Sequence, residues 1–80
     1  MSLRNSLASN LKREMSVRHW TQAELARLCG VSQPRIAELL KAKHSATLDT
    51  VDKIATVFGL PASALLLPVS ENSEIAVLTD

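Results

Sequence analysis

The sequence predicts a single all-α domain, and three observations favour that class. The chain has 80 residues, enough for one compact domain, and its 46% hydrophobic and 21% charged residues are typical of folded globular proteins. Only one Trp, one Phe, two Gly and three Pro occur, so residues that favour strands and tight turns are scarce. Apolar residues recur at helical spacing along most of the chain, which predicts a helical bundle rather than a β-sandwich or barrel.

The first helix is expected to begin near residue 3 and to run for roughly four turns. Its apolar stripe consists of residues four positions apart, namely Leu3, Leu7, Leu11 and Met15. Three basic residues fall off the stripe, toward water or a ligand: Lys12, Arg13 and Arg18. The pattern breaks at His19-Trp20, so the helix is expected to end there.

A second, short helix is predicted by a capping box at Thr21-Gln22-Ala23-Glu24. In such a box the Thr21 hydroxyl accepts from the Glu24 amide while the Glu24 side chain reaches back, and Trp20 and Leu25 supply the matching hydrophobic staple. Gly30 follows Cys29 as the glycine that commonly ends a helix.

A third helix is expected to start at Ser32, its N-cap. Pro34 falls in the first turn, where a missing backbone N–H costs nothing. The buried side of this helix consists of Ile36, Leu39 and Leu40. A polar loop containing Lys43 and His44 then leads to Thr47.

Thr47 is the expected cap of a fourth helix, which ends at Gly59, and Pro61 begins a short fifth turn through Leu66. The fourth helix keeps its apolar residues at helical spacing: Leu48, Val51, Ile54, Ala55 and Phe58. The apolar residues of the first and fourth helices are expected to lie in the core. Residues 1–68 therefore form the predicted domain and residues 69–80 an acidic tail. Within the tail, Glu74–Leu78 is a strand stub, a helix stub or a frayed end.

Several classes of protein are excluded by what the sequence lacks. The longest apolar run, at Leu65–Leu67, is far too short for a membrane span, and the first residues contain no apolar segment of a signal peptide. Cys29 is expected to be a small packed residue, since one cysteine and two histidines give no metal-binding spacing. No nucleophile–base pair, carboxylate pair or glycine-rich phosphate loop is present. We therefore expect a cytoplasmic protein that is not an enzyme and needs no metal or cofactor.

The charges are unevenly distributed although the formal net charge is only +1. All nine Lys and Arg lie between Arg4 and Lys53, where five acids reduce their sum to 9 − 5 = +4, and Glu71, Glu74 and Asp80 give the end of the chain −3. A basic body with an acidic tail fits a polyanionic partner.

The second and third helices together predict a helix-turn-helix. Two short helices joined by a glycine-centred turn form this unit, which projects the start of the later helix so that it can enter a DNA major groove. Residues 21–41, TQAELARLCGVSQPRIAELLK, resemble the helix-turn-helix of the XRE family of lambda-repressor-like and Cro-like DNA-binding domains. The later helices are similar too, so the resemblance covers roughly residues 7–67. It implies a five-helix domain that binds double-stranded DNA, usually as a two-fold dimer on a palindromic operator.

The resemblance also implies which residues meet DNA. The base-contacting residues would be Ser32, Gln33, Pro34, Arg35 and Glu38. The phosphate-contacting residues would be Thr21, Gln22, Lys41, Lys43, His44 and Ser45. Arg35 supports this interpretation independently, because a cation near the positive end of its own helix is unfavourable there and suits a partner outside the helix.

Two positions depart from the family pattern. His19 stands where the family often has glycine, so the turn after the first helix is expected to differ. Met15 and Leu40 replace a charged pair that is common between the family's first and third helices, and an apolar contact is expected there instead.

The preferred hypothesis is a sequence-specific transcriptional regulator, most simply a repressor that acts as a homodimer. The alternative is an antitoxin-like module that neutralises a toxin-like protein partner and regulates its own operon. The dimer surface is predicted to be apolar and to consist of Leu65, Leu66, Leu67 and Val69. Residues 74–78 are the second candidate for that surface.

Overall fold

The five expected helices are all present in the structure, a computed structural model that describes residues 3–43 and 46–67. They are α1 (Leu3–Arg18), α2 (Gln22–Cys29), α3 (Gln33–Leu40), α4 (Leu48–Phe58) and α5 (Ala62–Leu66). The described residues contain no strand, so the all-α class is confirmed. The predicted acidic tail, residues 69–80, lies outside the described residues.

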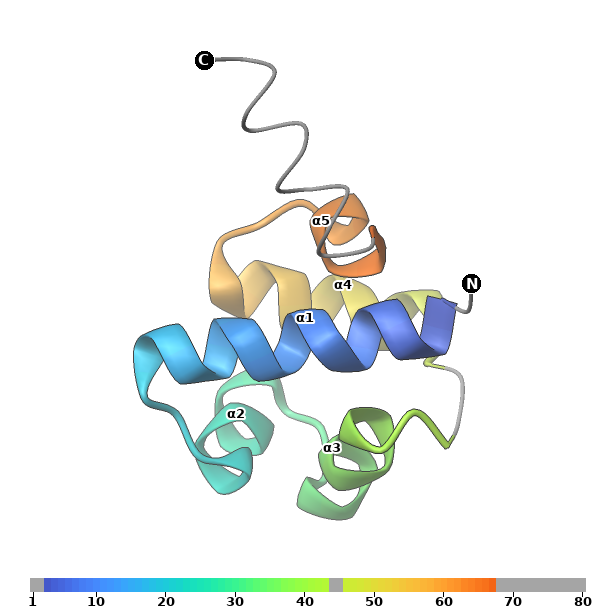
Figure 1. Cartoon of the computed structure of the whole chain (residues 1–80). Helices are drawn as coiled ribbons and strands as arrows, with labels where there is room; N and C mark the ends of the chain where they lie inside the picture. The colour runs from blue at the N-terminus through green and yellow to red at the C-terminus, as the bar shows by residue number, and fades with distance from the viewer. Residues whose placement is uncertain (1–2, 44–45, 68–80) are drawn as a thin grey trace.

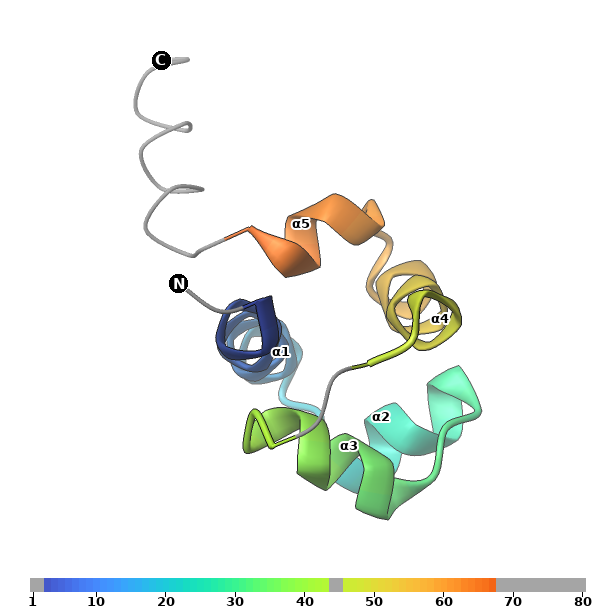
Figure 2. The same cartoon turned by 90° about the vertical axis from the view of Figure 1, so that its right-hand side faces the viewer.

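Helix α1 runs through the middle of the domain and divides the other helices into two groups (Figure 1). Helices α2 and α3 pack against each other on one side of α1, and α5 covers the opposite side. The view along α1 shows the same separation, with α4 completing the ring between α2 and α5 (Figure 2). The helix-turn-helix unit is therefore held at one end of the domain, away from α5.

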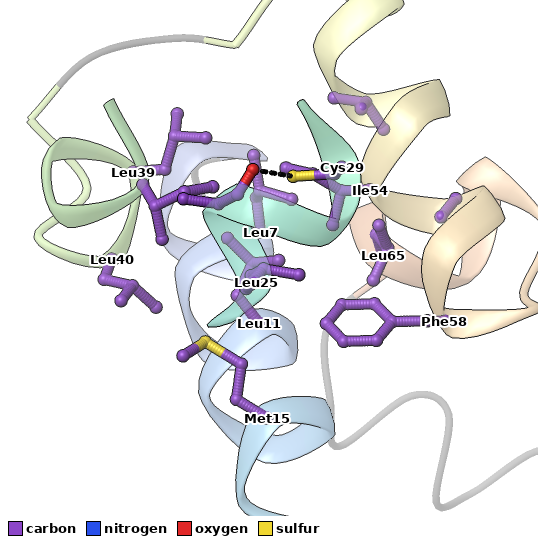
Figure 3. Close-up of a cluster of buried hydrophobic side chains, with 14 residues drawn as sticks. Leu7, Leu11, Met15, Leu25, Cys29, Leu39, Leu40, Ile54, Phe58 and Leu65 are labelled. Atoms are coloured by element: carbon purple, nitrogen blue, oxygen red, sulfur yellow. Dashed lines mark hydrogen bonds between the residues drawn. The ribbon is translucent and has the colours of Figure 1, made fainter. Parts of the chain in front are cut away.

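The core is formed by apolar side chains from all five helices (Figure 3). Leu11, Leu25, Ile36 and Leu65 are fully buried. Met15 and Leu40 are both buried in this cluster, as expected where an apolar pair replaces a charged one. The Cys29 thiol is also buried and donates a hydrogen bond to the Ala26 carbonyl at 3.9 Å. The remaining members of the cluster are Leu7, Ala26, Leu39, Val51, Ile54, Ala55 and Phe58.

Two residues assigned to the core from their spacing are exposed. Leu3 retains 67% of its accessible surface and Leu48 retains 84%. Both stand at the first position of their helices, where the preceding turn, toward which a helical side chain leans, is missing. The expectation that every apolar residue of these two stripes is buried was therefore wrong.

Four helices are followed, within two positions of their last residue, by a residue in the left-handed conformation: His19 (φ 57°), Gly30 (71°), Ala42 (57°) and Gly59 (73°). In each case the next amide donates to the carbonyl five residues earlier, the pattern of a Schellman cap. These bonds join Trp20 to Met15, Val31 to Ala26, Lys43 to Glu38 and Leu60 to Ala55. His19 thus adopts a conformation that suits glycine, and the turn after α1 has the same form as the turns at Gly30, Ala42 and Gly59.

Replacing His19 by glycine is expected to raise the free energy of unfolding by a few tenths to about 1 kcal/mol. Glycine relieves the left-handed strain, and the greater freedom that it gives the unfolded chain offsets part of the gain. The matched change Gly30→Ala should lower the free energy of unfolding by about 1 kcal/mol, because φ is +71°. The added Cβ meets nothing within 4 Å, so no steric clash adds to this cost. Urea unfolding of both variants checks this pair, and shifts in the same direction would contradict it.

Candidate DNA interface

The start of α2 is built by the capping box that the sequence predicts. The Glu24 amide donates to Thr21 Oγ1 at 3.1 Å, and the Thr21 amide donates to Glu24 Oε1 at 3.0 Å. The hydrogen bond from the Thr21 amide holds the pKa of Glu24 below its ordinary value. The Thr21 hydroxyl oxygen is thus committed to the cap, while its O–H can still donate to an outside group.

The start of α3 is formed by the short turn after Gly30. Ser32 adopts an extended conformation and its Oγ accepts from the Arg35 amide at 3.3 Å. Pro34 stands in the first turn of the helix, where it interrupts no intrahelical hydrogen bond. The cap and the proline therefore begin the helix at Gln33, as expected.

Helix α3 has two sharply different faces. Its inner face is buried and consists of Ile36, Leu39 and Leu40. Its first turn faces outward, with four successive exposed residues: Ser32, Gln33, Pro34 and Arg35. Because the anchoring residues begin only at Ile36, directly after the four exposed ones, the domain fixes α3 without covering its N-terminal end.

The structure gathers most of the predicted contact residues on one end of the domain, on α2, α3 and the turn after α3. Besides the four exposed residues of the α3 start, the exposed ones are Thr21, Gln22, Lys41 and Lys43. Glu38 is half-buried and interacts with another group of the protein. His44 and Ser45 lie outside the described residues.

The sequence predicts that Arg18 faces water or a ligand, and the structure places it differently. Its guanidinium is turned inward, donating to the Phe58 carbonyl at 2.8 Å and to Glu14 Oε1 at 2.6 Å. It also lies 4.7 Å from the centre of the Phe58 ring and 5.6 Å from that of Trp20, and the two rings stack. Arg18 therefore supplies a cation to the C-terminal end of α4 and joins it to the turn that leads into α2.

Replacing Arg18 by methionine is expected to lower the free energy of unfolding by about 1–2 kcal/mol at pH 7, through loss of partly exposed charge-assisted hydrogen bonds. Burial raises the pKa of Glu14, but the hydrogen bonds from Arg18 and Arg13 outweigh it and hold the pKa below its ordinary 4.5. The stabilisation from ionised Glu14 is therefore complete above that value and is lost as the pH falls through the lowered pKa.

The difference in the free energy of unfolding between the original chain and Arg18→Met should consequently become smaller in acid. Unfolding by urea at several pH values between about 3 and 7 measures it. Arg13→Met is the matched control, because Arg13 meets the same carboxylate at 3.2 Å from a more exposed position and should contribute well under 1 kcal/mol. Equal losses for the two arginine variants would contradict the inward role of Arg18.

Asn10 is a second residue that the sequence analysis did not identify. It is fully buried, and its Nδ2 donates to the Leu65 carbonyl at 2.8 Å and to the Leu67 carbonyl at 2.7 Å. Asn10 thus fastens α5 and the residue after it to α1. A polar residue three positions after Leu7 was the available signal, because it places Asn10 on the buried side of α1.

The predicted dimer surface needs a correction. Leu65 has no accessible surface, because α5 turns it into the core against α1 and α4. Leu66 is half-buried, and Leu67 retains 37% of its surface. Leu65 is therefore a core residue that cannot meet a partner, and Val69 lies outside the described residues.

The described part of the chain lacks two further features, a metal-binding cluster and a membrane-spanning helix. Among residues 3–43 and 46–67, no three His, Cys, Asp or Glu side chains are grouped so as to hold a metal ion. In the same residues, every helix is too short or too polar to cross a bilayer.

Comparison with known proteins agrees with this geometry. The model of the helix-turn-helix family matches residues 12–65, more than half of the chain. A hypothetical transcription factor of Neisseria meningitidis serogroup B (strain ATCC BAA-335 / MC58) is 32% identical over 73 residues, which cover 91% of this chain and 69% of that protein. The crystal structure of the hypothetical transcription factor NHTF from Neisseria superposes with a TM-score of 0.88 at 31% identity, covering 92% of this chain and 85% of that one. The chain belongs to the XRE-type helix-turn-helix family of DNA-binding transcriptional regulators.

Proposed function

We propose that this protein is a non-catalytic repressor that binds a palindromic operator as a homodimer and acts in the cytoplasm, where the DNA is. One observation carries the proposal. The first turn of α3 is exposed over four successive residues while the rest of the helix is anchored in the core. A B-DNA major groove is wide enough to admit a helix presented in this way.

The residues at the start of α3 offer distinct chemistry toward bases. Gln33 can bond bidentately to adenine N6 and N7, and Arg35 can bond to guanine O6 and N7 or grip a phosphate. Pro34 offers an apolar contact to a thymine methyl, and Ser32 can donate or accept. Glu38 could accept from a cytosine amino group, although its half-buried position and its interaction within the protein favour a role in orienting a neighbour.

The phosphates would be held from two sides of this helix. At the start of α2, the first amides have no acceptor within the helix, and the helix dipole favours an anion there, so Gln22 and the Thr21 hydroxyl are well placed. Lys43, and to a lesser degree Lys41, would meet the backbone on the other side, together with His44 and Ser45. Such contacts set the register and the affinity without reading sequence.

The homodimer follows from the two-fold symmetry of such operators, with half-sites about one helical turn apart. Of the apolar residues predicted for the dimer surface, Leu67 is exposed and Leu66 is half-buried. Val69 is the third residue of the proposed dimer surface.

Selection of bound duplexes from a random pool, followed by gel-shift titration of the best sequence, tests the proposed function. We expect a palindromic site bound about 1,000-fold or more tightly than a scrambled duplex, with affinity that falls steeply with salt. Equal, weak affinity for every duplex would remove the claim of specificity. Co-purification of one small protein that blocks DNA binding would instead favour the antitoxin-like function.

A further inference from the structure

An apolar groove lies on the surface formed by α1, α4 and α5, outside the proposed DNA interface. Its volume is about 140 Å³. Leu3, Leu7, Leu48, Val51 and Leu66 line it, together with Ala46 and Arg4. Arg4 is the one charged residue on the wall that the described residues provide.

Two of the groove residues are unusually exposed for their size. Leu48 retains 84% of its accessible surface and Leu3 retains 67%, although both are large and aliphatic. They stand beside the buried Leu7 and Val51, so the exposed apolar surface continues into the core. Covering these adjoining apolar side chains would remove apolar area from water and is therefore favourable.

The described chain ends at the edge of this groove. Leu66 is part of the groove wall, and the carbonyl of the next residue, Leu67, is held at 2.7 Å by buried Asn10. The point from which residues 68–80 continue is therefore fixed beside the groove. Ile75 is eight residues beyond Leu67 and can reach up to roughly 26 Å from it, so the distance does not limit its access to the groove.

The segment that follows has matching chemistry. Residues 74–78 read Glu-Ile-Ala-Val-Leu, and either an extended or a helical conformation puts two of the three large apolar side chains on one face. Glu74 opens this segment and Glu71 lies just before it, which suits the positive charge of Arg4. A groove of about 140 Å³ is close to the ~150 Å³ of apolar cavities that accept a benzene-sized group, so it has room for about one large side chain.

We propose that residues 74–78 dock in the groove of the same chain and cover Leu3 and Leu48. The short connection favours this over a second chain, because it holds the segment near the groove at a high effective concentration. Leu66 is then covered by the tail, and the proposed dimer contact rests on Leu67 and Val69. The inference does not depend on DNA binding.

Methyl nuclear magnetic resonance on the full 80-residue chain tests the proposal. With Ile, Leu and Val methyl groups labelled, we expect Overhauser contacts from Ile75, Val77 or Leu78 to Leu48 and Val51. Ile75→Ser combined with Val77→Ser should abolish these contacts and shift the Leu48 methyl signals. Leu48→Ser should abolish them as well, and it leaves folding intact because this side chain is 84% exposed.

Two controls make the experiment specific for docking within one chain. Leu28→Ser removes an apolar residue that is also exposed, at 46%, but lies on α2 away from the groove, so the contacts should persist. A mixture of labelled and unlabelled chains separates contacts within one chain from contacts between two. Contacts found only between chains would mean that a second copy fills the groove, and the absence of any contact from residues 74–78 would mean that the tail does not dock. Either result would overturn the proposal.

Discussion

Replacing Gln33 by alanine is expected to weaken binding to each half-site of the selected operator by about 5- to 150-fold, the effect of losing one bidentate base contact of roughly 1–3 kcal/mol per subunit. Gln33 is exposed at the first position of α3, so the change removes no core contact. The loss should be confined to operators that carry the preferred base at one position of each half-site. Gel-shift titration against operators varied at every position measures it.

Lys43→Ala is the matched variant for this experiment. Lys43 is exposed in the turn after α3, and its backbone amide donates to the Glu38 carbonyl at 3.3 Å, so a change of side chain leaves that bond in place. A phosphate contact predicts that all operators weaken alike and that the slope of log K against log salt concentration falls by about one for each subunit of the dimer. If both variants gave the same profile across the operators, the division between base and phosphate contacts would be wrong.

Replacing Asn10 by aspartate is expected to lower the free energy of unfolding by about 3–5 kcal/mol at pH 7, a large part of the total stability of a small domain. The side chain is fully buried and its Nδ2 donates to the Leu65 and Leu67 carbonyls. Aspartate would replace the donating Nδ2 by an oxygen, which is an acceptor facing those two carbonyl oxygens, and would bury a charge. Thermal and urea unfolding measure the loss.

The pH dependence identifies the cause of that loss. Burial should raise the pKa of an aspartate at position 10 in the folded state. The free energy of unfolding should therefore fall as the pH rises from the pKa of the unfolded chain, about 4, through the raised pKa of the folded state. The defect should therefore be smallest in acid. Asn5→Asp is the control, because Asn5 is exposed near the start of the same helix and a negative charge there should be neutral or slightly favourable. A loss independent of pH would contradict this explanation.

The helices could be predicted because the residues next to each helix end determine where it begins and ends. The capping box at Thr21 and Glu24, the cap at Ser32 and the left-handed Gly30 and Gly59 are all found where the local patterns place them. Each of these signals depends on contacts within about five residues, so no knowledge of the packed structure is needed. His19 and Ala42 adopt the same left-handed conformation without being glycine; the sequence predicts the helix end at His19 but does not indicate this conformation at either residue.

The contacts that join distant helices could not be predicted. Asn10 meets carbonyls 55 and 57 residues away, and Arg18 meets one 40 residues away, so nothing in their neighbours indicates the partners. Leu65 was expected at the surface because three consecutive leucines seemed more than a short helix could bury. Only the packing of α5 on α1 and α4 decides which of the three turns inward.

The candidate site falls between these cases. The caps and the buried triad of Ile36, Leu39 and Leu40 made the outward direction of the first turn of α3 predictable. The operator sequence is not predictable, because it depends on the docking angle of α3 and on the shape of the DNA.

Amide chemical-shift mapping of the isotopically labelled chain, titrated with the selected operator, tests most directly whether the start of α3 reads DNA. The largest changes should fall on residues 32–38, with a second group at Thr21 and Gln22, and a scrambled duplex should leave the first group nearly unchanged while still moving the second. Saturable changes centred on α4 and α5, with residues 32–38 unmoved, would contradict the proposed interface.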